Sequence, residues 1–385
     1  MISVSEALSI LRNHPPIPTL RTLPLEESVG LSLAEDTFSP ISLPSFDNSA
    51  MDGYAVGGPV GPWEIVDTIQ AGDLRGLSLG PCQAARIFTG SRVPARTYAV
   101  IAQESAAVSE PILSGEARQG QHLRRVGEEL AQGDLVLRAN SVLTPPRIAA
   151  LAALGVSDVK VKEISCGVIT TGNEVVEPGT KLHAGQIYNS NRFAVQSILQ
   201  HWGVRQEHLH VQDDPQILRN QIRDMASRHA LVVTTGGVSV GDHDHVVSAA
   251  QDCGFEMKFY KVAVKPGKPI AFGVRHDGAT WLGLPGNPLS TWVGMLVFFS
   301  AHIGRDLERR CFPLETAFET KGDRVQFIPA RITSDGAIQI EQSVGSHANT
   351  ALIHASALVH LPVGKTKYES GERVEGLVLP WSLSS

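Results

Sequence analysis

The chain has 385 residues, of which 42% are hydrophobic and 19% are charged, and its formal net charge is -6. At about 150 residues per domain, this length predicts two or three domains, and the composition is typical of a soluble globular protein. The negative net charge argues against non-specific nucleic-acid binding, which needs a positive field. A local cluster of donors must therefore hold any anionic ligand.

The four cysteines are far apart and form no Cys-x-x-Cys pair, so neither a zinc site nor a redox motif is predicted. The N-terminal segment lacks the basic region of a signal peptide. The most apolar stretch, residues 291–303, is shorter than the roughly 20 residues that span a bilayer. We therefore expect a cytoplasmic protein with free thiols and no membrane contact.

The first 163 residues contain two helical pieces and a β-rich piece. Ser3 and Glu6 fit a capping box at the start of the first helix, and Thr144 is expected to cap the second. Between the helices, the sequence is glycine-rich and has few helical periods. We interpret residues 1–44 and 133–163 as a split α+β N-terminal domain, with residues 45–132 as a β-rich domain inserted into it.

Residues 164–306 alternate between strand and helix patterns, which predicts a doubly wound, mostly parallel α/β domain. The expected strands are 167–170, 230–234, 255–264, 270–274 and 280–282. The expected helices are 191–201, one starting at Asp214-Pro215, 246–250 and 288–302.

Residues 307–385 contain short strand patterns instead of helices. The segments 326–333 and 338–342 flank an Asp-Gly pair that is typical of a hairpin. Two more strands are expected at 358–361 and 374–379. These elements predict a C-terminal β-barrel-like domain.

Four loops with glycine and small polar residues follow the strands of the α/β domain. They are residues 170–174, 234–244, 265–269 and 284–288. Ligands of open α/β sheets bind at the carboxyl ends of the strands, so we expect these loops to converge on one edge. Glycines in such loops let backbone N–H groups approach an anion. A single loop of this kind would more simply be a tight turn, and the repetition favours a site.

Lys265 and Lys268 are separated by a rigid Pro-Gly pair and could hold an oxyanion. Alternatively, both are solvated loop lysines. Ser290 is expected in the first turn of a helix, where its hydroxyl could face an anion or simply cap the helix.

Several carboxylates belong to the same loops or lie near them, and hard oxygen ligands of this kind suit Mg²⁺ shared with phosphates. They are Glu174, Asp213, Asp214, Asp242 and Asp244. One of the adjacent pair, Asp213 or Asp214, is expected to cap the following helix and the other to function.

Residues 47–56 combine two acids, an amide and a hydroxyl in one loop, more polar groups than a plain turn needs. Three histidines, His243, His245 and His347, have no metal-binding spacing, so structural or surface roles are predicted for them.

The chain resembles the molybdopterin molybdenumtransferase family, which includes bacterial MoeA and the E domain of gephyrin. The motifs that carry the resemblance occur in the family's order along nearly the whole chain. They are DNSAMDGYAV at 47–56, RRVGEE at 124–129, TGNE at 171–174, GGVSVGD at 236–242, KPGKP at 265–269, LPGNP at 284–288 and GSH at 345–347.

The resemblance implies a four-domain subunit, a homodimer and an active site in a cleft between subunits. It implies insertion of molybdenum from molybdate into adenylylated molybdopterin, with Mg²⁺ as cofactor and AMP as product. The molybdopterin adenylyltransferase and apo-molybdoenzymes are further implied partners.

Carried over by motif, the implied catalytic residues are Asp52, Glu174, Asp214, Asp244, Lys265 and Lys268. The implied substrate-binding residues are Thr89, Glu129, Gly236, Gly237, Ser239, Pro285, Gly286, Asn287, Ser290, Arg331 and Ser346. The implied metal ligands are Glu174, Asp242 and Asp244.

Two positions depart from the family pattern. Glu129 stands where the family usually has Asp, which moves the carboxylate by about one methylene, and His245 replaces a frequent aromatic residue. Two other functions remain open: pterin adenylylation, which uses a similar α/β domain, and a non-catalytic scaffold like gephyrin. The additional N- and C-terminal regions argue against the first, and the retained lysines and carboxylates argue against the second.

Overall fold

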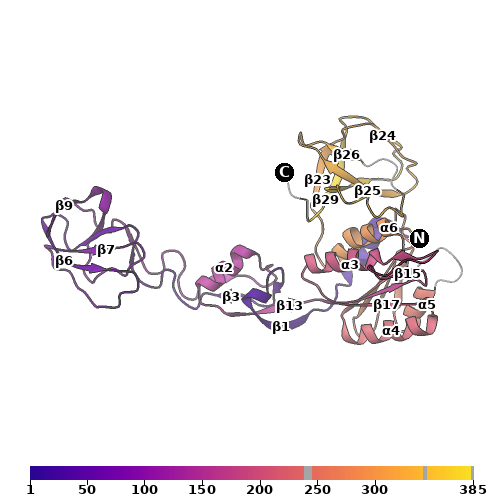
Figure 1. The fold of residues 1–385 in the computed structure, drawn as a ribbon, viewed down its shortest axis with the longest axis horizontal. Helices are drawn as coiled ribbons and strands as arrows, with labels where there is room; N and C mark the ends of the chain where they lie inside the picture. Colours follow the sequence, from indigo (N-terminus) through magenta and orange to yellow (C-terminus); the bar gives the residue numbers. More distant parts are fainter. Residues whose placement is uncertain (238–244, 341–344, 383–385) are drawn as a thin grey trace. The chain divides into compact units, whose positions relative to one another are not determined.

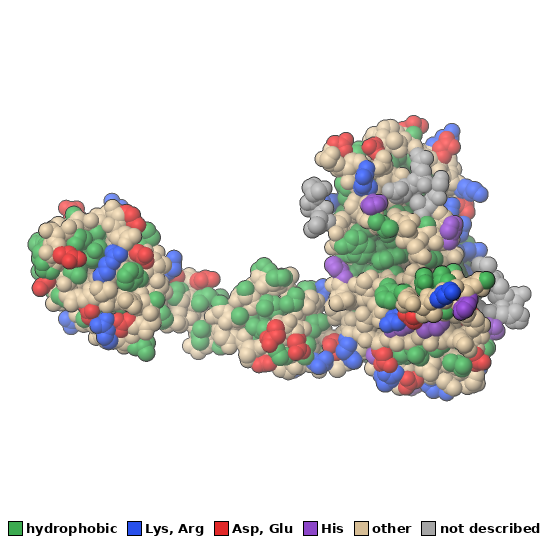
Figure 2. All heavy atoms as spheres, in the orientation of Figure 1, with side chains coloured by type: hydrophobic (Ala, Val, Ile, Leu, Met, Phe, Trp, Pro, Cys, Tyr) green, Lys and Arg blue, Asp and Glu red, His purple; other side chains and the backbone are tan. Residues whose placement is uncertain are grey.

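The computed structural model describes residues 1–237, 245–340 and 345–382. They form two compact units, one built from residues 22–161 and the other from residues 1–21 and the chain after 161. No helix in the described ranges is long and apolar enough to cross a membrane. On the visible face, Lys and Arg side chains alternate with Asp and Glu (Figure 2). Ser239, Asp242 and Asp244 lie outside the described residues.

One core of the smaller unit combines residues from both ends of its sequence. Leu23, Leu33, Leu143 and Val161 are buried together in it. They belong to the sheet β1-β13-β2 and its surroundings, beside the helix that follows Thr144 as predicted. The bounds are β1 Thr19–Pro24, β2 Ser32–Leu33, α2 Pro145–Ala153 and β13 Asp158–Glu163; β3 Thr37–Phe38 pairs with β12 Leu135–Leu137.

The β-rich piece is a six-stranded sheet with the order β8-β5-β7-β6-β10-β9. Its strands are β5 Gly53–Val56, β6 Trp63–Ile69, β7 Gln83–Ile87, β8 Ala99–Ala102, β9 Ala107–Ser109 and β10 Ile112–Ser114. Next to it, β4 Asn48–Ser49 pairs with β11 Leu123–Arg124. The Asp47 carboxylate accepts hydrogen bonds from the Arg125 guanidinium and the Val126 N–H, so this ion pair joins the start and the end of the β-rich piece.

The larger unit is organised around a sheet with the order β17-β14-β18-β22-β21-β19, which confirms the α/β prediction. The bounds are β14 Ser165–Thr171, β17 Arg205–Val211, β18 Leu231–Thr235, β19 Glu256–Tyr260, β21 Ala271–Val274 and β22 Thr280–Leu284. The first four strands in the order are parallel, and β21 is antiparallel to both neighbours. Because of this reversal, β19 is parallel to β22, and the segment between β19 and β21 lies at the carboxyl edge of the sheet.

Helices cover both faces of this sheet (Figure 1). On one face lie α1 Val4–Asn13, α3 Ser190–His201 and α6 Pro288–Val293, which continues through a π-helical segment Gly294–Phe299 into α7 Ser300–His302. On the other face lie α4 Pro215–Arg228 and α5 His245–Asp252. The predicted capping box of α1 is confirmed. This helix packs into the core of the larger unit, whereas the predicted split domain began at residue 1.

The C-terminal β region has the strand order β20-β25-β27-β29-β23, with β26 paired to β25 in the predicted hairpin. The bounds are β20 Val264–Lys265, β23 Arg309–Pro313, β25 Val325–Ile332, β26 Ile338–Ile340, β27 Ala357–Leu361 and β29 Arg373–Val378; β24 Phe318–Glu319 pairs with β28 Lys367–Tyr368. The predicted single strand 255–264 is therefore wrong, because its apolar run is divided between β19 and β20 in two different sheets. The parallel pair β20–β25 joins Lys265 to the C-terminal sheet.

We predict that His302 makes stability depend on pH. Its side chain is buried, with Nδ1 3.2 Å from the Leu11 carbonyl and Nε2 3.0 Å from the Thr280 hydroxyl. Burial lowers the pKa of His302 to about 4. This pKa is below that of histidine in the unfolded chain, so the contribution of neutral His302 to the free energy of unfolding is complete above about pH 6.5. That contribution is lost as the pH falls toward 4, by roughly 3 kcal/mol in total.

The measurement is urea denaturation of the wild type and His302→Asn between pH 7 and 4. The variant should be less stable at pH 7 but should lose less free energy of unfolding over this range. Parallel pH curves for the two proteins would refute the assignment to His302.

Candidate active site

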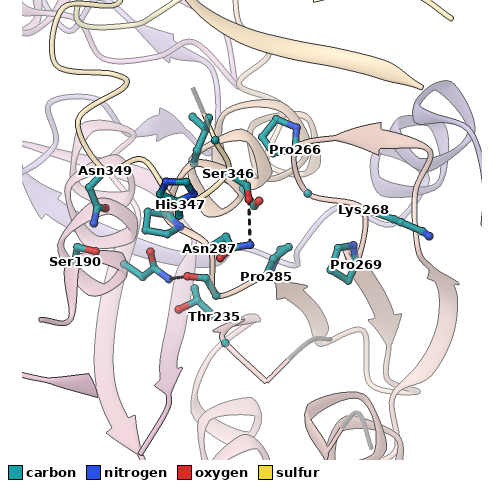
Figure 3. Close-up of a pocket in the computed structure, with 18 of the residues that line it drawn as sticks. Ser190, Thr235, Pro266, Lys268, Pro269, Pro285, Asn287, Ser346, His347 and Asn349 are labelled. Atoms are coloured by element: carbon teal, nitrogen blue, oxygen red, sulfur yellow. Dashed lines mark hydrogen bonds between the residues drawn. The ribbon is translucent and has the colours of Figure 1, made fainter. Parts of the chain in front are cut away.

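A cavity of 1290 Å³ opens at the carboxyl edge of the larger unit's sheet. Each of the four glycine-containing loops contributes several described residues to its lining, which confirms their predicted convergence. The starts of α3 and α6 and parts of the C-terminal β region complete the lining (Figure 3). The cavity therefore combines the loops of the α/β sheet with side chains from the C-terminal sheet.

Glycine allows three of these loops to approach one another closely. Gly236 has a φ of 94°, and a Cβ at this position would lie 2.5 Å from the Thr171 carbonyl oxygen. A Cβ on Gly286 would lie 3.3 Å from the Gly236 Cα. Larger residues would push the loops apart, so the predicted glycines are required for packing in addition to any contact with a ligand.

Two polar atoms in the lining have no hydrogen-bond partner among the described residues. The Thr235 hydroxyl is buried without a partner, and so is Asn191 Oδ1. Asn191 itself is fixed, because its Nδ2 donates to the Gly286 carbonyl at 2.7 Å (Figure 3). Buried polar groups are normally paired, so these atoms are well suited to bind a polar ligand.

The C-terminal GSH motif contacts the start of α6 through Ser346. Asn287 Nδ2 donates to the Ser346 hydroxyl at 3.2 Å, and the Leu289 N–H donates to the Ser346 carbonyl at 3.1 Å (Figure 3). Ser290 is buried in the lining, as is Pro285. The structure thus brings these predicted residues together.

The 265–269 loop and the C-terminal β region contribute positively charged side chains to the cavity lining. Lys265 and Lys268 both line it, and neither ammonium group has an ion pair or hydrogen bond with a described residue. Arg324 also lines the cavity and is 3.3 Å from Asp323. Arg331 does not line it, because it lies near the β25–β26 hairpin and donates to Gln339. Arg324 replaces Arg331 as the arginine of the cavity.

Carboxylates approach the cavity from the opposite part of the sheet. Glu174 and Asp213 line it, and Asp213 accepts a short hydrogen bond from the Thr171 hydroxyl. Asp214 instead caps α4, accepting from the N–H groups of Gln216 and Ile217 at 2.9 and 2.8 Å. Of the adjacent pair, Asp214 is therefore the capping residue and Asp213 the one that lines the cavity, whereas the resemblance implies Asp214 as the catalytic residue.

The described residues contain no cluster of three or more His, Cys, Asp or Glu that would hold a metal by itself. The exposed carboxylates of Glu174 and Asp213 still fit Mg²⁺, which takes one or two carboxylates and completes its shell with phosphate oxygens and water.

Three predicted site residues belong to the smaller unit and are not in the cavity lining. The Asp52 carboxylate accepts from the Thr89 N–H at 2.7 Å and the Thr89 hydroxyl at 2.8 Å. The Thr89 N–H, together with the hydroxyl, holds the pKa of Asp52 below its usual value. Glu129 is exposed, and its N–H donates to the Leu43 carbonyl. The structure therefore pairs the ionised Asp52 carboxylate with Thr89.

Sequence reasoning missed several lining residues. A structural or surface role was predicted for His347, yet this residue lines the cavity next to Ser346 and near Asn349 (Figure 3). Tyr188 and Gln326 were also missed. For His347 a signal was present, because it belongs to the same motif as Ser346.

The fold and the cavity define a multidomain α/β protein whose ligand site at the carboxyl edge combines unpaired cations with exposed carboxylates. The chain matches "MoeA N-terminal region (domain I and II)" over residues 2–155, "Probable molybdopterin binding domain" over 167–304 and "MoeA C-terminal region (domain IV)" over 312–379.

Named relatives span most of the chain. A molybdopterin molybdenumtransferase of Haemophilus influenzae is 38% identical, covering 76% of this chain and 74% of the relative. One of Staphylococcus aureus is 31% identical, covering 97% and 94%. The crystal structure of the molybdopterin biosynthesis moea protein from Pyrococcus horikosii has a TM-score of 0.82 at 29% identity, covering 98% of this chain and 99% of that one. The chain belongs to the molybdopterin molybdenumtransferase family.

We predict that replacing Asp213 and replacing Asp214 lower the free energy of unfolding by different amounts. Asp214→Ala should lower the free energy of unfolding by about 1 kcal/mol, because α4 loses its N-cap. Asp213→Ala should have a smaller effect, since its carboxylate belongs to an exposed residue, caps no helix and accepts from the Thr171 hydroxyl. Urea denaturation at pH 7 measures both, and a larger loss for Asp213→Ala would reverse the assignment.

Proposed function

We propose that this protein inserts molybdenum into molybdopterin, using adenylylated molybdopterin and molybdate as substrates and releasing AMP. The observation that carries the proposal is the cavity, whose lining combines Lys265 and Lys268 with the other glycine-containing loops of the α/β sheet. Family membership supports molybdopterin as the substrate class.

The α/β loops would hold the phosphate-containing part of the substrate. The Thr235 hydroxyl and Asn191 Oδ1 are free to bond to it, and the glycines permit close approach of backbone N–H groups. Glu174 and Asp213 would bind Mg²⁺, which supplies charge neutralisation at the phosphate oxygens. Water attack on phosphorus then cleaves the phosphoanhydride, with AMP as the leaving product. These residues act mostly by positioning and electrostatics.

Lys265, Lys268 and Arg324 would concentrate molybdate beside the pterin dithiolene. All three line the cavity of a protein whose net charge is negative, so a doubly charged oxyanion would be attracted to this part of the cavity. Ser346 and His347 lie at the rim and could donate hydrogen bonds to the same anion.

The remaining proposals rest on the family resemblance. We infer that the protein is a cytoplasmic homodimer, and that Asp52, Thr89, Asp244 and the usual family positions at Glu129 and Ser239 take part in the reaction. Its product would pass to apo-molybdoenzymes, and its substrate would come from the molybdopterin adenylyltransferase.

The function is tested by mixing the purified protein with adenylylated molybdopterin, Mg²⁺ and molybdate. We expect AMP release that depends on molybdate and yields cofactor able to activate an apo-molybdoenzyme. Molybdate-independent AMP release without active cofactor would contradict the coupling. ATP consumption with unmodified molybdopterin would identify an adenylyltransferase instead.

We predict that the cavity cations set the molybdate requirement. Lys268→Ala and Arg324→Ala should each raise the molybdate concentration for half-maximal cofactor formation about tenfold, the loss expected for one charge-assisted contact worth about 1.4 kcal/mol. Arg331→Ala is the matched control, because this arginine lies outside the cavity lining and pairs with Gln339. An unchanged requirement in Lys268→Ala, or a large change in Arg331→Ala, would remove the proposed anion site.

A further inference from the structure

The hydroxyl of Thr170, at the end of β14, contacts three side chains from two other segments. Asn189 Nδ2 donates to it at 2.9 Å, while His208 Nε2 and His210 Nδ1 each lie 3.1 Å away. His208 and His210 are two residues apart on β17, so they point to the same face, and His210 is the register partner of Thr170.

This arrangement uses the full bonding capacity of the hydroxyl group. A hydroxyl donates one hydrogen bond and accepts two. Because the Asn189 Nδ2 group can only donate, one imidazole nitrogen must accept the Thr170 proton and the other must donate its own. Burial, with Arg192 adding to it, lowers the pKa of His208 to about 4. His208 is therefore neutral near pH 7, with one ring nitrogen free to accept.

Asn189 links this hydroxyl to the loop that contains Glu174. Its Nδ2 is also 3.1 Å from Glu177 Oε1, and its Oδ1 accepts from the Arg192 N–H at the start of α3. The other Glu177 oxygen is paired with the Arg192 guanidinium at 2.7 Å. One buried amide therefore holds the sheet, the loop and the helix in a fixed relation.

Backbone hydrogen bonds next to Asn189 hold the two ends of this loop together. The Asn189 N–H donates to the Val176 carbonyl at 2.8 Å, and the Ile187 N–H donates to the Glu174 carbonyl at 2.9 Å. These bonds belong to the short parallel pair β15 Val175–Val176 and β16 Ile187–Tyr188. By contrast, the Glu174 carboxylate accepts no hydrogen bond from a described residue. The place from which it reaches the cavity is therefore set by the backbone of this loop.

We propose that Thr170, Asn189, Glu177, His208 and His210 form a positioning network that holds the Glu174 carboxylate toward the cavity. This inference rests on the proposed function of Glu174 as a ligand of Mg²⁺ and phosphate. Partners behind a metal ligand commonly change metal affinity by 10- to 100-fold when they are removed, as expected for groups that orient a ligand without touching the metal.

The test compares Thr170→Val with Thr234→Val. Thr234 is a matched control, because it lies on the adjacent strand β18, is fully buried, has an unpartnered hydroxyl and does not line the cavity. Thr170→Val should raise the Mg²⁺ concentration for half-maximal AMP release about tenfold. Thr170→Ser should restore it, and Thr234→Val should stay within about twofold of the wild type.

A second readout does not depend on activity. Amide hydrogen exchange of residues 174–188 should be faster in Thr170→Val than in Thr234→Val, because the loop loses its attachment to the sheet. If Thr170→Val does not fold, Glu177→Gln provides the same test, since it removes the ion pair to Arg192 but keeps an oxygen for Asn189.

Glu174→Gln separates the inference from the function on which it rests. If Glu174→Gln is as active as the wild type, the proposed role of Glu174 fails. If Glu174→Gln is inactive while Thr170→Val and Glu177→Gln match Thr234→Val in Mg²⁺ requirement and exchange, the positioning network alone is overturned.

Discussion

The direction of the strands at one side of the α/β sheet determines the rest of the site. Four neighbouring strands are parallel, so their following loops meet at the carboxyl edge. Because β21 is reversed, β19 also runs toward this edge and β21 starts from it. The segment between these two strands therefore places Lys265 and Lys268 at the same edge. Since β20 then pairs with β25, the C-terminal sheet is attached at this loop, next to the cations. One topological feature therefore supplies both the loops and the second wall of the cavity.

The loops were predictable from the sequence, because glycine and small polar residues repeat after each apolar strand and the carboxyl-edge rule needs no further information. Which of Asp213 and Asp214 caps α4 could also have been predicted from the sequence. A residue before proline is disfavoured in the helical region, and proline is favoured at the first helical position. Asp214 precedes Pro215, so it had to be the extended N-cap, as its φ of -106° and ψ of 119° confirm.

Other features depend on tertiary pairing that a single sequence does not encode locally. The apolar run 255–264 resembles one strand, but it bends after Tyr260 and its end joins a different sheet. The resemblance implies Arg331 as a binding residue, and only the register opposite Gln339 shows that it lies by a hairpin outside the lining. Metal-ligand spacing, the only criterion applied to His347, does not reveal a residue that lines a cavity without belonging to a metal cluster.

Thr170 and Thr235 occupy paired positions at the ends of adjacent parallel strands, yet their hydroxyls are used in opposite ways. Thr170 has every hydrogen-bonding position filled by protein groups, whereas Thr235 is buried beside the cavity with none filled. A buried, unpaired hydroxyl costs on the order of 1–3 kcal/mol, which valine at the same place would avoid. The same edge thus contains one hydroxyl that fixes the protein framework and one without a partner among the described residues, and a polar ligand group that bonds to the second would offset its cost.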